Sequence, residues 1–250
     1  MGNTHILMMG DAPNQAAPKP LPKLARATQP SVADQVFDLL QHRILTLDLP
    51  PGTKLSEGEV AGQMGVSRQP VREAFKRLAA QGFLLIRPQR STTVSLISEA
   101  AVLRARFIRT ALETHTFRLA CTTLTSADIA ALRALIDAQK TAITAQDRAL
   151  FHALDDQFHR EVCIRSGVGY AWDLIHDSKA HMDRIRMLSL NSQSQQHALR
   201  EHIAILDAIE QGNPDAAARA MDSHLSRITT LIAEVKAVNH GWFTDAADLG

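Results

Sequence analysis

Apolar residues recur at helical spacing along most of the chain, and turn-forming residues separate the periodic stretches. The first stretch follows Ser31, an N-cap residue with Asp34 at the capping-box position, and stops at Pro50-Pro51-Gly52. Its apolar positions share one helix face: Val32, Val36, Leu39, Leu40 and Ile44. Two shorter helices are predicted next, from Ser56 to Met64 and from Ser67 to about Gln81, with Gly65 between them.

The pattern then changes from helical spacing to two short β-branched and aliphatic runs. Residues 84–87 and 92–96 read as strands around the turn Pro88-Gln89-Arg90-Ser91. A two-stranded hairpin directly after three helices is typical of a wing, so the pattern predicts a winged helix-turn-helix over residues 31–97.

Helical spacing returns at Ser98 and continues nearly to the end. Six helices are predicted, at 99–121, 126–144, 147–166, 169–190, 193–211 and 214–237. Short connections between them favour an antiparallel six-helix bundle over residues 98–238. The fold class is therefore mainly α, and we expect a flexible arm at 1–30, with five prolines, and a frayed tail at 239–250.

Composition narrows the class of protein. Hydrophobic residues make up 45% and aromatic residues only 4%, which favours a helical globular protein over a β-sandwich. No apolar run approaches the roughly 20 residues of a membrane span, and residues 1–30 lack the pattern of a secretory signal. The two cysteines, Cys121 and Cys163, form no disulfide framework, so we expect a cytoplasmic location.

Charge is uneven although the net charge is only +1. Residues 66–95 carry six basic side chains and one acidic one. A solvated helix face explains such a run by itself, but this one coincides with a helix-turn-helix pattern in which Ala61, Gly65 and Val71 occupy the crossing, turn and core positions. The run therefore predicts binding to DNA, a polyanion.

The third helix is the predicted recognition helix. Arg68 and Arg72 are i,i+4 neighbours at its start, and arginine is the common reader of guanine in the major groove. We assign DNA contact to the start of this helix and to the wing, through the following residues: Ser67, Arg68, Gln69, Arg72, Lys76 and Arg90.

Two motifs make a family resemblance specific. Pro51 to Glu57 (PGTKLSE) and Gly65 to Leu78 (GVSRQPVREAFKRL) resemble the winged-helix domain of the GntR family of bacterial transcription regulators. The helices that follow resemble the effector domain (FCD domain) of its FadR subfamily, in the VanR-like branch, and the resemblance covers about 31–237. Gly58 stands where the family usually has Arg, and Ser91 stands where it usually has Gly at the wing tip.

Asp155, His159, His202 and His224 form a candidate metal site. Asp155 and His159 are i,i+4 on one helix, while His202 and His224 are equidistant from the turn at Gly212-Asn213-Pro214. In an antiparallel hairpin, residues equidistant from the turn face each other. Three imidazoles and a carboxylate suit a divalent ion, with zinc as the first expectation and nickel, cobalt or manganese as alternatives. The resemblance implies the same four ligands.

Two neighbouring residues leave alternatives open. His152 lies i,i+3 from Asp155, so it could replace a ligand or support one. Arg109 on the first bundle helix could clamp the carboxylate of an effector, or it could pair with Glu113 at i+4. Arg184 and Arg186 are weaker candidates for effector contact.

The sequence therefore predicts a ligand-responsive transcription regulator rather than an enzyme. We expect a repressor that binds a palindromic operator as a homodimer and is released by a small organic acid bound at the metal and Arg109. A metal-dependent enzyme that uses the Asp/His site, and a pure metal sensor, remain the alternatives.

Overall fold

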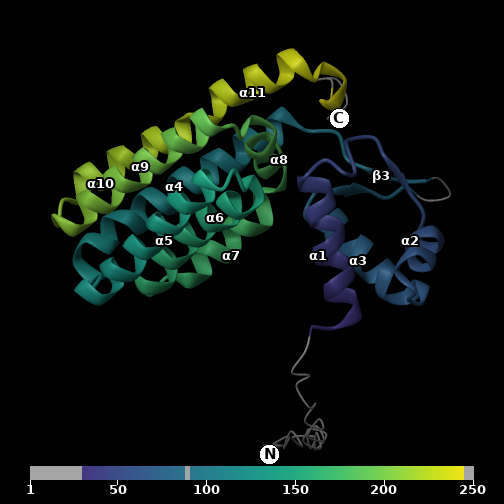
Figure 1. Cartoon of the computed structure of the whole chain (residues 1–250), viewed down its shortest axis with the longest axis horizontal. Coiled ribbons are helices and arrows are strands. Elements are labelled where there is room, and N and C mark those ends of the chain that lie inside the picture. The colour runs from purple at the N-terminus through teal and green to yellow at the C-terminus, as the bar shows by residue number, and fades with distance from the viewer. Residues whose placement is uncertain (1–29, 88–90, 245–250) are drawn as a thin grey trace, which may run out of the picture.

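The computed structural model describes residues 30–87 and 91–244, which form two lobes (Figure 1). Three predictions lie wholly or partly outside the described residues: the arm at 1–30 except for Pro30, the DNA-contacting residue Arg90, and residues 245–250 of the tail. Figure 1 places the winged-helix lobe at the right and the longer helical lobe at the left, with the chain crossing between them only after strand β3. The predicted fold class is confirmed, with three differences in its details.

The described residues of the winged-helix domain, 31–87 and 91–97, contain three helices and three strands. The helices are α1 (Val32–Leu45), α2 (Glu57–Met64) and α3 (Arg68–Ala80), and the strands are β1 (Lys54–Leu55), β2 (Leu84–Leu85) and β3 (Thr92–Val94). Strand β3 lies between the other two and pairs with both in antiparallel fashion. The predicted hairpin is therefore part of a three-stranded sheet. Sequence analysis missed β1 because two residues are too few to show alternation.

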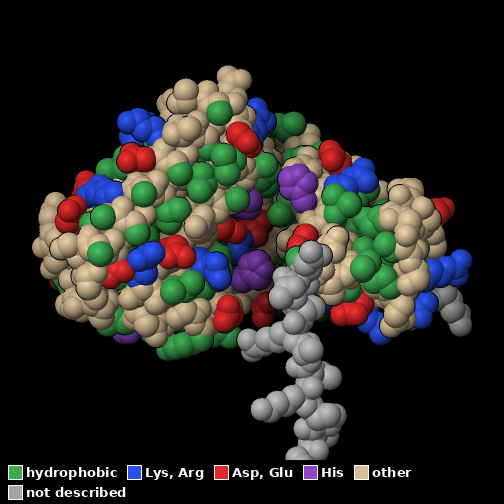
Figure 2. Space-filling view, turned by 60° about the horizontal axis from the view of Figure 1, so that its bottom comes forward, with side chains coloured by type: hydrophobic (Ala, Val, Ile, Leu, Met, Phe, Trp, Pro, Cys, Tyr) green, Lys and Arg blue, Asp and Glu red, His purple; other side chains and the backbone are tan. Residues whose placement is uncertain are grey.

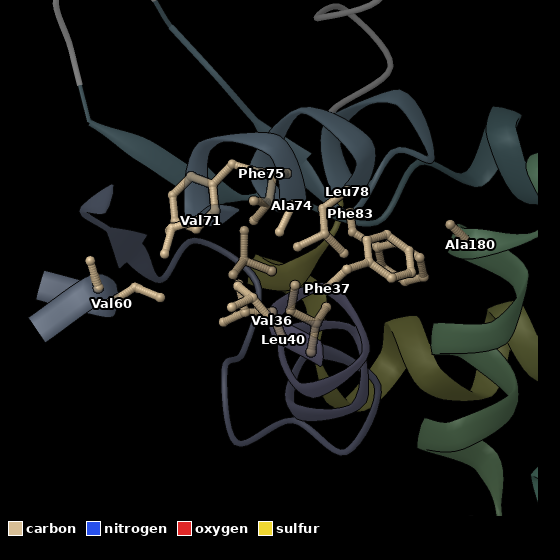
Figure 3. Close-up of a cluster of buried hydrophobic side chains, with 14 residues drawn as sticks. Val36, Phe37, Leu40, Val60, Val71, Ala74, Phe75, Leu78, Phe83 and Ala180 are labelled. Carbon is tan, nitrogen blue, oxygen red and sulfur yellow. The ribbon is translucent and has the colours of Figure 1, made fainter. Parts of the chain in front are cut away.

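Gly65 makes the turn between α2 and α3 by adopting a φ of 65° and ψ of 30°. This left-handed conformation ends α2 and is one that glycine adopts without a steric penalty. The turn sets the start of α3 beside α2, and Val71, Ala74, Phe75 and Leu78 then face α1 in a continuous apolar core (Figure 3).

The helical domain contains eight helices within residues 98–244. They are α4 (Glu99–Thr123), α5 (Ser126–Thr144), α6 (Arg148–Arg165), α7 (Gly169–Ser178), α8 (Ala180–Ser189), α9 (Ser192–Glu210), α10 (Pro214–Ser226) and α11 (Ile228–Val238). The predicted count of six is wrong because two predicted helices are interrupted, at Lys179 and at Arg227. Neither break is marked by glycine or proline. Lys179 instead bonds to Asp156 on α6 and to Asp183 on α8, a tertiary contact that periodicity cannot reveal.

The predicted frayed tail also differs from the structure up to Thr244. Residues His240–Trp242 form a short 3-10 helix, and Phe243 forms a parallel bridge with Ile97 at the domain boundary. The C-terminal segment therefore returns to the start of the helical domain, as Figure 1 shows at the upper right. Among the described residues, no helix is long and apolar enough to cross a membrane.

Candidate metal centre and DNA-contacting face

The four predicted metal ligands lie together inside the helical domain. Asp155 and His159 come from α6, His202 from α9 and His224 from α10, and one ligand atom from each lies within 4.8 Å of the others. The rings of His202 and His224 are 4.9 Å apart between centroids, as their equal distance from the α9–α10 turn predicts. The first three side chains are fully buried, and the His224 side chain is 8% exposed.

Each of the three imidazoles has an amide or carboxylate oxygen behind its Nδ1 atom, within hydrogen-bonding geometry for His202 and His224 and as an ion contact for His159. Nδ1 of His202 is 2.9 Å from Oε1 of Gln139, and Nδ1 of His224 is 2.8 Å from Oε2 of Glu201. Nδ1 of His159 is 2.5 Å from Oε2 of Glu113. Such outer partners orient the rings of metal-ligating histidines and fix their tautomers. Sequence analysis missed these partners, because they lie on α4, α5 and α9 and share no spacing with the histidines.

The inward-facing atoms of the cluster lack partners among the described residues. Oδ1 of Asp155 and the Nε2 atoms of His159 and His202 are buried and make no hydrogen bond there. Burial lowers the pKa of both His202 and His224, which keeps their rings in the neutral form that ligates a metal. Converging buried atoms with unused lone pairs fit a divalent metal ion, which would satisfy all of them at once.

Two arginines border the cluster. Arg186 on α8 contacts Oδ2 of Asp155, and Arg109 on α4 places its Nε 2.5 Å from Oε1 of Glu113. Burial alone would raise the pKa of Asp155, but the charge of Arg186 holds that pKa well below its usual value. The structure thus shows Arg109 in the i,i+4 ion pair with Glu113, one of the two alternatives for this residue. Arg186 is the arginine that touches a metal ligand.

A cavity of about 50 Å³ opens beside the cluster. Asp155 and His224 form part of its wall, and Arg109 and Arg186 reach the same space. The remaining wall is largely apolar, with two serine hydroxyls, and comprises Phe151, Met182, Ser189, Leu190, Ser194, Ala198, Leu225, Arg227, Ile228 and Leu231. A metal bound by the four ligands would therefore have polar and apolar groups within reach of a small molecule.

His152 belongs to a different cluster. Its Nε2 atom lies 4.0 Å from Oδ1 of Asp183, on the side of α6 that faces a cleft of about 210 Å³ between the two lobes. Figure 2 shows the hollow between the lobes with acidic and histidine side chains gathered along it. Lys179 occupies the centre of this cluster, with its Nζ 2.5 Å from a carboxylate oxygen of Asp156 and another of Asp183. His152 groups with Asp156 and Asp183, apart from the four candidate metal ligands, and the lysine ammonium already supplies a cation to that second cluster.

The predicted DNA-contacting residues that the structure describes form one exposed face. Ser67, Arg68, Gln69, Arg72 and Lys76 are all exposed along the outer side of α3. Arg72 is engaged by Glu57 at the start of α2, with Nε 3.0 Å and Nη2 3.0 Å from Oε2. Glu57 is a residue that sequence analysis overlooked, because helix spacing does not reveal a contact between two separate helices.

Comparison with known proteins decides the family. The model of the "Bacterial regulatory proteins, gntR family" matches residues 32–94, and that of the "FCD domain" matches residues 105–227. The HTH-type transcriptional repressor RspR of Escherichia coli K12 is 38% identical over 219 residues, which cover 87% of this chain and 96% of that protein. This chain belongs to the GntR family of bacterial transcription regulators.

Other relatives support the same placement. A probable D-xylose utilization operon transcriptional repressor of Paenarthrobacter nicotinovorans is 32% identical over 206 residues, covering 80% of this chain and 88% of that protein. Among solved structures, McbR/YncC of Escherichia coli has a TM-score of 0.71 at 23% identity, covering 82% of this chain and 99% of that one. A likeness at that identity shows the shared fold.

Family membership fixes the coarse function. The GntR domain makes this chain a DNA-binding transcription regulator, and its FCD domain places it in the FadR subfamily. Proteins of this kind are not enzymes, so the alternative of a metal-dependent enzyme at the Asp/His cluster is ruled out.

Proposed function

We propose that this regulator is a homodimeric repressor that binds a palindromic operator and is released by a small carboxylate metabolite at a metal in the helical domain. The observation that carries the proposal is the set of buried, inward-facing atoms of Asp155, His159 and His202 beside a cavity that two arginines reach. Repression is further supported by the names of the relatives, two of which are described as repressors.

The charge around the cavity favours an anionic effector. Arg109 and Arg186 carry two positive charges, and their carboxylate partners Glu113, Asp155 and Asp156 carry three negative ones, so these five groups sum to −1, which a divalent ion would turn into +1. A divalent ion at the cluster would leave an excess of positive charge in a low-dielectric interior, where uncompensated charge is costly. A carboxylate would offset that charge, with one oxygen able to occupy an open position of the metal and the other to meet a guanidinium.

Metal content tests the centre directly. Purified protein should carry about one divalent ion per chain, with zinc the first expectation, and His202→Ala or His224→Ala should remove most of it. His152→Ala is the matched control, because His152 also lies on α6 but outside the four-residue cluster. This variant should leave the metal content nearly unchanged. Elemental analysis after dialysis measures all three variants. Equal loss from His152→Ala would contradict the assignment of ligands.

Calorimetry with a panel of sugar acids, hydroxy acids, dicarboxylates and aromatic acids tests the effector class. We expect one class to bind metal-loaded protein more tightly than apo protein, and to release the protein from the DNA upstream of its own gene in a gel shift. Arg109→Ala should weaken this response while metal stays bound. Binding that depends on neither metal nor Arg109 would place the effector elsewhere, and release by metal alone would favour a pure metal sensor.

The dimer is proposed to form through the outer face of α4. Leu103 and Phe107 are i,i+4 neighbours there and are 41% and 75% exposed, whereas Val102 on the opposite side is buried in the core. Two-fold pairing of this face would present two recognition helices to a palindromic site. Phe107→Glu should shift the protein to monomer in sedimentation and weaken operator binding. A wild-type monomer at micromolar concentration with intact DNA binding would contradict the proposal.

A further inference from the structure

Helix α8 is the only helix of the helical domain with side chains in both the winged-helix core and the cavity of the metal centre, among the residues that the structure describes. Successive α-helical residues are about 100° apart, so positions two apart fall on nearly opposite faces. Ala180 and Arg184 are directed toward the winged-helix domain, while Met182, Arg186 and Ser189 line the cavity. The winged-helix core and the cavity therefore lie on opposite sides of α8, one helix width apart.

Close packing joins α8 to the winged-helix domain. Ala180 belongs to the winged-helix core, and Figure 3 shows it on α8 at the Phe83 end of that core. His181 packs so tightly on Gly82 that an added Cβ there would lie 3.1 Å from its Nε2 atom. The same ring accepts a hydrogen bond from the Ser98 backbone N–H at its Nδ1 atom, over 3.3 Å.

Arg184 is the polar link across this interface. Its side chain is fully buried, and its Nη1 donates to the backbone oxygen of Ser95 at 2.7 Å and to Oγ of the same residue at 3.2 Å. Its Nε and Nη2 atoms have no partner, and no carboxylate pairs with it, within the described part of the chain. Burial lowers the pKa of this guanidinium to about 10. A buried charge without a counter-ion costs stability, so Arg184 joins the two domains through its hydrogen bonds and not through an ion pair.

The opposite face of α8 is tied to a metal ligand. Arg186 contacts Oδ2 of Asp155, whose Oδ1 faces the imidazole of His202 at 3.6 Å from Nε2. Arg186 is held by two carboxylates, those of Asp155 and Asp156. A metal ion would draw on the first of them, so occupation of the centre would change the electrostatic hold on Arg186. That hold acts on a ten-residue helix whose other face carries Arg184.

We propose that α8 couples the metal centre to the winged helix, and that Arg184 is the positioning residue that makes the coupling rigid by fixing α8 to Ser95. This inference rests on the proposed metal centre. Ser95 directly follows Val94, the last residue of β3. A shift of α8 therefore reaches the sheet of the winged-helix domain through the hydrogen bond between Arg184 and Ser95.

Hydrogen exchange of the full-length protein, with and without zinc ion alone, tests the coupling. In the wild type, zinc should slow exchange in peptides covering 155–162, at the centre, and also in peptides covering 83–97, by about fivefold or more. Arg184→Met should keep the first effect and lose the second. The variant should fold at least as stably as the wild type, because an apolar side chain of similar length replaces an uncompensated charge.

Arg106→Met is the matched control. Arg106 also donates to a serine, with Nη2 2.9 Å from Oγ of Ser226, but this contact joins α4 to α10 inside the helical domain. The Arg106→Met variant should still show slower hydrogen exchange at 83–97 when zinc is added. Two results would overturn the coupling. Zinc could still slow exchange at 83–97 in Arg184→Met, or zinc could slow exchange in the wild type at 155–162 but not at 83–97. Absence of protection at 155–162 in the wild type would instead overturn the metal centre, and the coupling with it.

Discussion

The two domains place their polar chemistry in opposite ways. In the winged-helix domain the buried core is entirely apolar, and the predicted DNA-contacting residues that the structure describes are exposed at the start of α3 and along it. In the described part of the chain, every buried polar or charged side chain lies at position 98 or later. One domain therefore presents its predicted DNA-contacting residues on the outside of an apolar core, and the other builds its candidate metal site from the core itself.

This difference determines how substitutions should behave. Exposed ion pairs contribute about 0–1 kcal/mol each, so the residues of the DNA-contacting face should act nearly independently. Buried charges depend on one another, because removal of one partner leaves the other without compensation in a low-dielectric interior. Large and non-additive effects are expected in the helical domain and small, additive ones in the winged helix.

The largest effect is expected from Glu113→Leu. This change leaves Arg109 buried and unpaired and removes the group behind Nδ1 of His159. The free energy of unfolding of the metal-free protein should fall by about 3–5 kcal/mol in urea denaturation. Arg118 lies on the same helix as Glu113 and forms an exposed ion pair with Asp215 on α10. Arg118→Ala should lower the free energy of unfolding by less than about 1 kcal/mol.

A double variant sharpens this prediction. Arg109→Met combined with Glu113→Leu should recover most of the lost stability, because no charge is then left uncompensated. Additive losses in the double variant would show that the two residues contribute separately rather than as a pair.

The second effect concerns the DNA-contacting face. Arg72→Ala should weaken operator binding by about 1–3 kcal/mol and relax the preference at one base pair, as gel shifts on operator variants would show. Glu57→Gln should have the opposite sign, because it frees the Arg72 guanidinium from an exposed pair that DNA must otherwise displace. If Arg72→Ala binds the native site unchanged, α3 does not read bases through this residue.

The extent to which sequence predicts each region follows from the same difference. The winged helix was predictable because its signals are local: the Ser31 cap, the turn at Gly65 and the apolar spacing of α3 all act within a few residues. That the four candidate metal ligands lie together was predictable because helix spacing and hairpin symmetry extend local rules across one turn. Gln139, Glu201 and the break at Lys179 were not predictable, since each depends on contacts between helices distant in sequence.

The third effect is a dependence of the free energy of unfolding on pH, which arises from His181 at the interface between the domains. Burial and the Arg184 charge lower the pKa of His181 to about 4, from 6.5 for an unperturbed histidine. The unfolded chain therefore binds a proton between these values that the folded chain does not. The associated stability is complete above pH 6.5 and is lost as pH falls toward 4, reaching a loss of about 2 kcal/mol at pH 5.

Comparison of wild type and His181→Gln isolates this contribution from that of other buried groups. Urea denaturation at pH 8 and pH 5 in chelator should show a smaller pH-dependent loss in the variant, by about 2 kcal/mol. The same dependence in both proteins would show that His181 keeps an ordinary pKa at the interface.

The smallest effect is expected at Gly58, where the family usually carries arginine. A Cβ at this position would lie 3.3 Å from Nη2 of Arg68, so any side chain there displaces the end of that arginine. Gly58→Arg adds one positive charge to the DNA-contacting face. Each added phosphate contact steepens the dependence of affinity on salt by about 0.9, so the ratio of Kd at 200 mM to Kd at 50 mM salt should rise about three- to fourfold. Gly58→Ala moves Arg68 without adding charge and should leave that ratio unchanged while altering base preference. An unchanged ratio in Gly58→Arg would mean that the start of α2 does not approach the phosphate backbone, and that this chain docks on DNA through α3 and the wing alone.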